Sequence, residues 1–128
     1  MLSACENVKV PAKIQKHFLE MQPNASDFVW TVEGNIYQVD FYLDNRHTTS
    51  YFDKQGTWLE TESEITVDEL AHDVLQTLKT KMGEYTIVDI ELVNTKEGEI
   101  LYEVDLEKGE KIYDILFNPN GKILRKKI

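Results

Sequence analysis

The fold of this chain is decided by the stretch YQVDF at residues 37–41, which returns as YEVDL at residues 102–106. The offset between the two stretches is 65 residues (102 − 37). A second pair, FDKQG at residues 52–56 and FNPNG at residues 117–121, has the same offset (117 − 52). Two matched segments at one offset indicate an internal repeat in which each half forms one supersecondary unit. The chain is therefore interpreted as a tandem duplication.

An amphipathic helix opens each half. Apolar residues recur at helical spacing over residues 10–22 in the first half and over residues 67–82 in the second. Thr66 and Glu69 have the spacing of a capping box at the start of the second helix. Gly83 is expected to end that helix in the left-handed conformation that glycine tolerates. Both apolar stripes are expected to face the core.

Four short alternating segments follow each helix. They are predicted as strands over residues 27–33, 36–44, 47–53 and 57–62, and over residues 85–94, 99–107, 110–117 and 121–127. Tight turns between them favour hairpins, and hairpins make a sheet antiparallel. The expected fold is α+β, a duplicated α-β-β-β-β repeat whose antiparallel sheet of about eight strands carries one helix per repeat on one face. The predicted organisation is a tether at residues 1–9, repeat 1 at 10–65 and repeat 2 at 66–128.

Alternation along the strands separates two sheet faces. The face under the helices should hold Phe28, Trp30, Val32, Tyr37, Val39, Phe41 and Leu43 in repeat 1, and Val88, Ile90, Leu92, Tyr102, Val104 and Leu106 in repeat 2. The opposite face should carry Asp40, Tyr42 and Trp58 in repeat 1, and Glu103 and Asp105 in repeat 2. The register leaves open whether Leu59 takes the place of Trp58, and which of two further aromatics, Tyr51 and Phe52, faces outward. Aromatic side chains among charged ones are typical of protein-binding surfaces, so this set is predicted to bind a partner. Packing between the repeats is the alternative.

The chain resembles the PepSY-like family of bacterial envelope proteins, which share the fold of beta-lactamase inhibitor protein. The resemblance rests on Val10-Pro11, Pro23, the stretch at residues 37–40 and the stretch YFDKQGTW at residues 51–58. It implies a concave eight-stranded sheet, an exported protein and no established enzymatic role. The sequence departs from the family pattern at residues 44–46, where the usual glycine is missing. It departs again at Ile123, where repeat 1 has an aromatic residue.

Composition narrows the function classes. The chain has 128 residues, and its 14 Lys+Arg against 23 Asp+Glu give a formal net charge of −9. Nucleic acid is an unsuitable partner for such a chain, because phosphate binding needs a basic face. The sequence has no run of about 18 apolar residues, the length that a membrane-spanning helix requires, so no membrane span is predicted. A single cysteine, Cys5, excludes an intramolecular disulfide and a cysteine-based zinc site.

The first residues of the chain resemble a localisation signal. Residues 2–5, LSAC, resemble a bacterial lipobox, in which Cys5 is the lipidated residue. The charged and apolar regions that precede a lipobox are missing from this sequence. The expectation is a periplasmic or envelope-anchored lipoprotein, and an ordinary free thiol is the alternative.

No catalytic, cofactor-binding or metal-binding residue is predicted. His17 and His72 lie on the expected helices beside polar neighbours and should be solvated. Asp40 and Asp105 occupy equivalent repeat positions and could form a carboxylate pair or bind a hard cation such as Ca²⁺. Two solvated carboxylates are the simpler interpretation.

The basic residues of the last segment, Lys122, Arg125, Lys126 and Lys127, are expected to protect a sheet edge. The alternative is two oppositely charged rims, the acidic one formed by Glu60, Glu62 and Glu64, that steer a partner or promote self-association.

The sequence thus predicts a non-enzymatic, exported protein-binding domain, inhibitor-like in its use of an open sheet face. A small-ligand or cation-binding envelope protein is the alternative, and it would need a pocket between sheet and helix or between repeats.

Overall fold

The computed structural model describes residues 8–128 and divides the chain into two compact units, Met1–Glu62 (unit 1) and Ser63–Ile128 (unit 2). The strands follow one another in sheet order from β1 to β8. Every recorded pairing, β1 with β2, β2 with β3, and β5 to β8 in succession, is antiparallel. The predicted α+β fold with an antiparallel eight-stranded sheet and one helix per half is confirmed.

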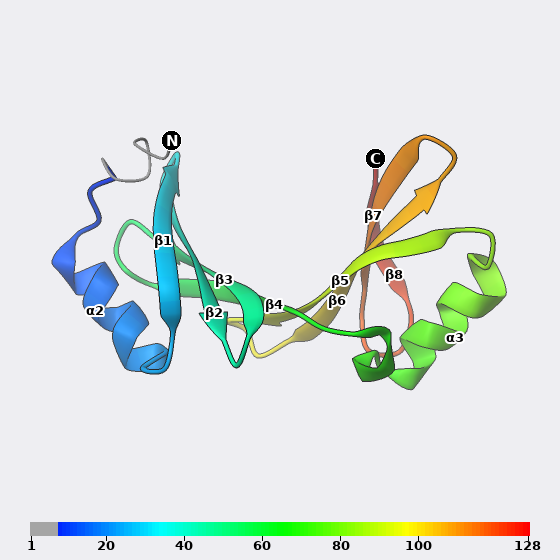
Figure 1. The fold of residues 1–128 in the computed structure, drawn as a ribbon, viewed down its shortest axis with the longest axis horizontal. Coiled ribbons are helices and arrows are strands. Elements are labelled where there is room, and N and C mark those ends of the chain that lie inside the picture. Colours follow the sequence, from blue (N-terminus) through cyan, green and yellow to red (C-terminus); the bar gives the residue numbers. More distant parts are fainter. Residues whose placement is uncertain (1–7) are drawn as a thin grey trace. The chain divides into compact units, whose positions relative to one another are not determined.

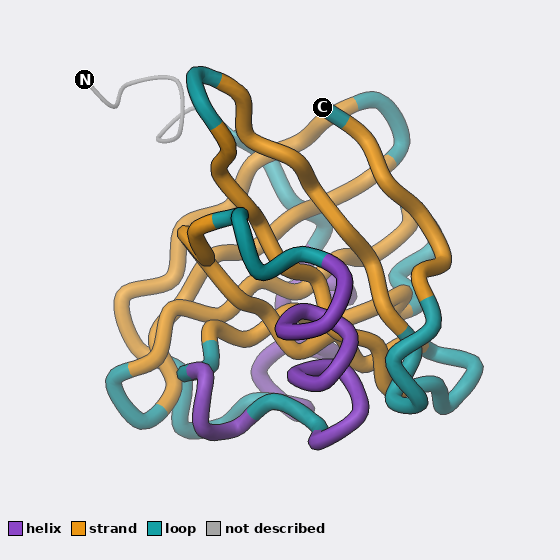
Figure 2. The backbone as a smooth tube through the Cα atoms, turned by 90° about the vertical axis from the view of Figure 1, so that its right-hand side faces the viewer, coloured by secondary structure: helices purple, strands orange, loops and turns teal. Residues whose placement is uncertain are grey.

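The elements lie close to their expected bounds (Figures 1 and 2). The first half contains α2 (Ala12–Met21), β1 (Ser26–Glu33), β2 (Ile36–Leu43), β3 (Arg46–Asp53) and β4 (Trp58–Glu64). The second half contains the 3₁₀ turn η1 (Val67–Glu69), α3 (His72–Lys81), β5 (Thr86–Thr95), β6 (Ile100–Lys108), β7 (Lys111–Phe117) and β8 (Ile123–Lys127). Figure 2 shows how short the loops are that join the strands, as the hairpin turns require.

The turn that lacks the usual glycine is a tight hairpin all the same. Asp44 and Asn45 both take positive φ, at 52° and 65°, and the pair Leu43–Arg46 closes the β2–β3 ladder behind them. Positive φ at both central residues is typical of the two-residue type I′ turn, whose twist matches the twist of the flanking strands. Asp and Asn adopt positive φ at a lower energetic cost than other non-glycine residues. The departure at residues 44–46 therefore leaves the hairpin intact.

The core of unit 1 forms between α2 and the inner face of its strands. Ile14 and Phe18 of α2 are buried against Val39, Phe41 and Phe52. The Phe18 ring meets that of Phe41 edge-on, with centroids 5.0 Å apart. The apolar stripe predicted for this helix is confirmed, and Phe52 is the inward-facing member of the Tyr51–Phe52 pair.

The core of unit 2 is built in the same way. Leu70, Val74, Leu78 and Met82 pack against Ile90, Val104, Leu106, Ile115 and Phe117. The expectation that Val88 faces this core is wrong, because it is 52% exposed. A register shift between Ile87 and Asp89 displaces it, and Ile87 packs against the core instead.

The second helix is shorter than predicted. Leu70 has extended backbone angles (φ −67°, ψ 145°) and separates η1 from α3, so one continuous helix over residues 67–82 is wrong. The Thr66–Glu69 contact is confirmed: Glu69 Oε1 accepts hydrogen bonds from the Thr66 backbone N–H and hydroxyl, each at 3.0 Å. Gly83 does not take positive φ. Met82, the residue before it, ends the helix and donates its N–H to Leu78.

A side chain from each helix contacts the turn before the last strand of its half. The hydroxyl of Thr77 on α3 donates to the carbonyl oxygen of Gly121 at 2.8 Å. In unit 1, Nδ1 of His17 on α2 lies 2.8 Å from the carbonyl oxygen of Gly56, which accepts from the Nδ1 tautomer. His17 is therefore half-buried between α2 and the turn, and the expectation that it is solvated is wrong. His72 is exposed as expected.

Candidate partner-binding site

The register of β2 and β3 defines the sheet face of unit 1 that points away from α2. Asp40 lies opposite Thr49, and Tyr42 lies opposite His47. Their sequence neighbours Val39 and Phe41 are buried under the helix, so these four side chains project from the other face. We call this surface the outer face of unit 1. It carries the two residues, Asp40 and Tyr42, that the sequence predicted there.

Asp40 is the centre of a polar network on the outer face. Its Oδ1 accepts a 2.6 Å hydrogen bond from the Thr49 hydroxyl, and its Oδ2 lies 3.2 Å from the donating Nε2 of Gln38. His47 Nε2 lies 3.6 Å from Asp40 Oδ1. These contacts hold the carboxylate in a fixed orientation with part of its surface still open. An anion held in this way is suited to recognising a donor on another molecule.

Tyr42 presents an apolar surface beside this network. Its side chain is 45% exposed, and its ring meets the His47 ring edge-on with centroids 5.8 Å apart. Val29, which lies opposite Asp40 on β1, is 44% exposed. An aromatic ring and an aliphatic side chain thus flank a carboxylate. The outer face therefore offers a partner an apolar surface and, beside it, an oriented hydrogen-bond acceptor.

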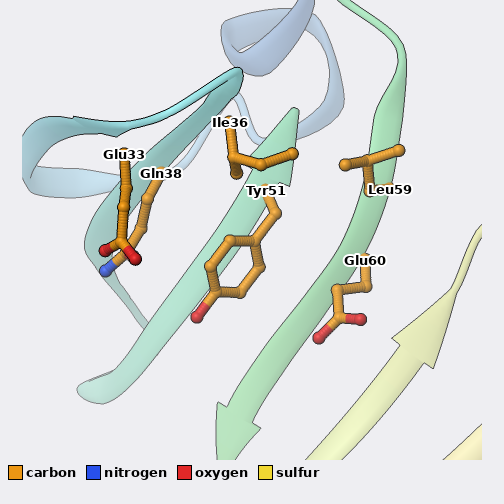
Figure 3. Close-up of a pocket in the computed structure, with 6 residues that line it drawn as sticks. All are labelled: Glu33, Ile36, Gln38, Tyr51, Leu59 and Glu60. Carbon is orange, nitrogen blue, oxygen red and sulfur yellow. The ribbon is translucent and has the colours of Figure 1, made fainter. Parts of the chain in front are cut away.

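A pocket of about 470 Å³ opens on the same face (Figure 3). Its lining comes from all four strands of unit 1: Glu33, Ile36, Gln38, Tyr51, Leu59 and Glu60. Figure 3 shows the Tyr51 ring with Glu33 and Gln38 on one side and Glu60 on the other. Ile36 and Leu59 lie near one end of the pocket. The volume is within the range of small-molecule sites, about 300–1,000 Å³. The lining joins aliphatic walls to two carboxylates.

Unit 2 carries an acidic cluster on the face that points away from α3. Arg125 of β8 donates from Nη2 to Glu103 Oε2 at 2.9 Å and to Asp114 Oδ1 at 3.0 Å. Glu91 lies opposite Glu103, and Asp105 lies opposite Asp114. One guanidinium thus joins β6 to β7, and the strand register places Glu91 and Asp105 beside the two carboxyl groups that it contacts.

Two carboxyl groups of this cluster, those of Glu103 and Asp105, resist ionisation. Burial raises the pKa of Glu103 to about 8, and the adjacent carboxylates of Asp114 and Glu91 contribute to the rise. Burial also raises the pKa of Asp105, with Asp114 and Asp89 acting in the same direction. A carboxyl group with a pKa near 8 holds its proton through much of the neutral range, so Glu103 can donate a hydrogen bond as well as accept one.

The predicted partner-binding residues are therefore distributed over both units. Asp40 and Tyr42 lie on the outer face of unit 1, and Glu103 and Asp105 lie on the corresponding face of unit 2. Trp58 does not share this position: it packs against the helix-side core cluster and donates its indole N–H to Thr61 at 2.8 Å. The expected outward orientation of Trp58 is wrong, and Leu59 lines the outer pocket in its place. Cys5 is outside the described residues, and its lipidation stays a prediction.

Several residues of these two faces were not predicted as site residues from the sequence. Arg125 was expected to protect a sheet edge or to form part of a basic rim, but its side chain bonds two carboxylates within unit 2. Of the pocket residues, Glu33 was not singled out, and Glu60 was considered only as part of an acidic rim. Alternation places Glu33 on the outward side next to Val32, but the positions of Glu60 and Arg125 require the exact strand register. Sequence alternation does not give that register across a turn, because one residue more or less reverses every side chain.

Comparison with known proteins identifies relatives of the same fold. A sequence model of the family described as "Putative beta-lactamase-inhibitor-like, PepSY-like" matches residues 35–125. No curated protein matches the chain. Among solved structures, a protein from Bacteroides fragilis described as BLIP-like is 26% identical, with a TM-score of 0.82, and the match covers 94% of this chain and 86% of the other.

Two further structures show the same fold. One, from Bacteroides eggerthii and described among "putative periplasmic proteins", has a TM-score of 0.88 at 22% identity, with 94% of this chain and 89% of the other covered. A DUF2874 family protein from Bacteroides uniformis has a TM-score of 0.87 at 24% identity, covering 93% and 89%. Within residues 8–128, no helix has the length and apolar character needed to span a membrane.

Proposed function

The chain belongs to the PepSY-like, beta-lactamase-inhibitor-like family, and from this premise we propose that it is a non-enzymatic domain that binds another protein through its outward sheet faces. The binding set comprises Asp40 and Tyr42 in unit 1 and Glu103 and Asp105 in unit 2. Trp58 is left out of the set because its side chain packs toward the core. The inhibitor-like description of the family and the BLIP-like neighbour both support a protein partner.

One observation carries this proposal: Tyr42 is 45% exposed beside an oriented carboxylate. A half-exposed aromatic ring gains apolar burial when a partner covers it, and tyrosine is enriched at interface hot spots. Truncating such a residue typically costs more than about 1 kcal/mol of binding free energy. The fixed Asp40 carboxylate adds specificity, because a partner without a donor at that position would leave it desolvated and unpaired.

The chemistry around Asp40 supports a binding role over a catalytic one. Thr49 is the hydroxyl that the carboxylate contacts, and this residue is 4% exposed, out of reach of a substrate. A nucleophile must be open to the reacting group as well as paired with a base. The chain is further proposed to act in the bacterial periplasm or anchored to the envelope. The description of the Bacteroides eggerthii structure and the resemblance of residues 2–5 to a lipobox support this location.

The test is capture of a partner by the purified full chain from an envelope extract of the source organism, with identification by mass spectrometry. The informative variant is Tyr42→Ala. Its matched control is Leu19→Ala, because Leu19 is 44% exposed and lies on α2, on the helix side of unit 1. Circular dichroism of both variants verifies that they fold.

The proposal expects a protein that the wild type and Leu19→Ala capture and that Tyr42→Ala loses by about tenfold or more, which corresponds to roughly 1.4 kcal/mol. Equal capture by folded Tyr42→Ala would reject the surface assignment. An empty capture by the folded wild type would favour the small-ligand alternative, for which unit 1 offers the pocket of about 470 Å³.

A further inference from the structure

The pocket of unit 1 contains the elements of a receptor for one cationic side chain. Glu33 and Glu60 supply two carboxylates from β1 and β4, and no basic side chain is among the six residues that line it. Ile36 and Leu59 supply aliphatic wall. Side chains that end in a cation have long apolar stems, so they need both kinds of surface at once.

The remaining lining residues favour arginine among cations. Tyr51 offers an aromatic ring, and guanidinium groups stack on aromatic faces. Gln38 donates from Nε2 to Asp40, so its oxygen is the amide atom that can accept from a ligand. The five N–H groups of a guanidinium point in several directions in one plane, which suits acceptors that come from different strands.

The protein's own charge is complementary to this occupant. A chain with a formal net charge of −9 attracts basic partners over a distance set by ionic strength. The pocket lies on the same outer face as Asp40 and Tyr42, and Gln38 belongs to both because it lines the pocket and bonds Asp40. A partner that covers Tyr42 and extends along β2 past Asp40 to Gln38 reaches the pocket.

We propose that this pocket receives an arginine side chain from a loop of the protein partner, held between the Glu33 and Glu60 carboxylates with its stem against Ile36 and Leu59. The inference rests on the proposed function, since it assigns part of the same binding face. It adds the chemistry of the partner: the segment it inserts is basic at one position and narrow enough to enter a pocket of about 470 Å³.

In the first experiment, blocked tripeptides are titrated into the isotope-labelled full chain at low salt. Binding is monitored by the NMR chemical shifts of the protein. The arginine probe is Ac-Gly-Arg-Gly-NH₂, and the same peptides with lysine and norleucine are its comparisons. The arginine peptide should bind saturably in the millimolar range, with the shifts centred on the side-chain amide of Gln38 and the backbone of Ile36, Tyr51 and Leu59. Added salt should weaken it, because screening reduces the attraction of an open carboxylate pair.

The variants separate the pocket from general acidity. Glu33→Gln/Glu60→Gln should weaken the arginine peptide by at least about tenfold, since both charge-assisted contacts lose their charge. The control variant Glu20→Gln/Glu97→Gln also removes two negative charges, but at exposed positions outside the pocket. It should leave the binding of the arginine peptide unchanged. Norleucine binding as strong as arginine binding, or equal weakening in both double variants, overturns the pocket assignment. Lysine binding as tightly as arginine overturns the choice of arginine.

Capture from the envelope extract separates this inference from the proposed function. If Tyr42→Ala loses the partner and Glu33→Gln/Glu60→Gln keeps it, the binding face stands and the pocket assignment is refuted. If no protein is captured although the arginine peptide binds, the proposed function fails, and with it the assignment of the occupant to a protein loop. Loss of the partner in both variants, with retention in Glu20→Gln/Glu97→Gln, is the expected result.

Discussion

Gly121 should be the least replaceable glycine of the chain. A Cβ atom there would overlap the backbone oxygen of Asp73 on α3 and lie 2.6 Å from Thr77 Oγ1. Gly121 also has a φ of +84°, which L-residues rarely adopt. Gly98 is a matched control, because its φ is also +84° and no described atom lies within 4 Å of its Cβ position. Gly121→Ala and Gly98→Ala thus share the backbone strain and differ in the steric overlap.

The expected losses follow from these contacts. Positive φ costs each alanine variant about 1–2 kcal/mol of unfolding free energy. Gly121→Ala adds overpacking of about 1–3 kcal/mol, because the turn must move away from α3. That movement also stretches the hydrogen bond from Thr77 to Gly121, a contribution of about 0.5–1.5 kcal/mol. Gly121→Ala should therefore be less stable than Gly98→Ala by about 1.5–4.5 kcal/mol.

Chemical denaturation followed by far-UV circular dichroism measures the difference. Trp30 and Trp58 both lie in unit 1, so tryptophan fluorescence follows that unit separately. A third variant, Gly56→Ala, has a comparable φ of +90° but only an ordinary 3.4 Å contact with Ile14, and it should behave like Gly98→Ala. Unfolding free energies of Gly121→Ala and Gly98→Ala that agree within about 0.5 kcal/mol would refute the reasoning.

Two further outcomes test the core and the acidic cluster. Phe18→Ala removes a side chain that is 1% exposed and should cost about 3–5 kcal/mol of unfolding free energy. Phe28→Ala removes a side chain that is 42% exposed and should cost clearly less. Equal losses in denaturation monitored by tryptophan fluorescence would contradict the packing described for unit 1. Because the folded pKa of Glu103 is about 8, above its ordinary value of 4.5, the folded state keeps a proton that the unfolded chain has released. The stability should therefore fall as pH rises from about 4.5 to about 8, by at most about 1.4 kcal/mol per pH unit from this group. Glu103→Gln should flatten that slope in urea titrations at pH 5 and pH 8, and an unchanged slope would count against a raised pKa.

Much of the fold could be predicted because local signals coincide with it. Strand bounds differ from expectation by no more than two residues, since turn residues such as Gly34 and Gly109 end the alternating segments where hairpins need them. The stripe of Ile14 and Phe18 likewise determined which side of α2 is buried. These features depend on neighbours within one turn or one hairpin, which a sequence displays directly.

The orientation of individual side chains was decided by the tertiary structure. Trp58 and Leu59 are adjacent and both apolar, and only packing against the core of unit 1 determines that Trp58 is the inward one. Val88 is not in the core of unit 2 as expected, because the strand register shifts between Ile87 and Asp89. Each of these outcomes depends on the register between strands. The alternation of apolar and polar residues in the sequence does not reveal a register shift of one residue.

The element order, the antiparallel sheet and the acidic charge can be read from the sequence alone, because they follow from short-range patterns and composition. Which charged side chains meet depends on the folded structure. Arg125 lies 22 residues from Glu103 along the chain, yet their side chains are 2.9 Å apart. The burial that raises the pKa of Glu103, and the pocket assembled from four strands, arise only when distant segments pack together. The proposed partner would recognise that three-dimensional surface, so the proposed binding function depends on the tertiary structure.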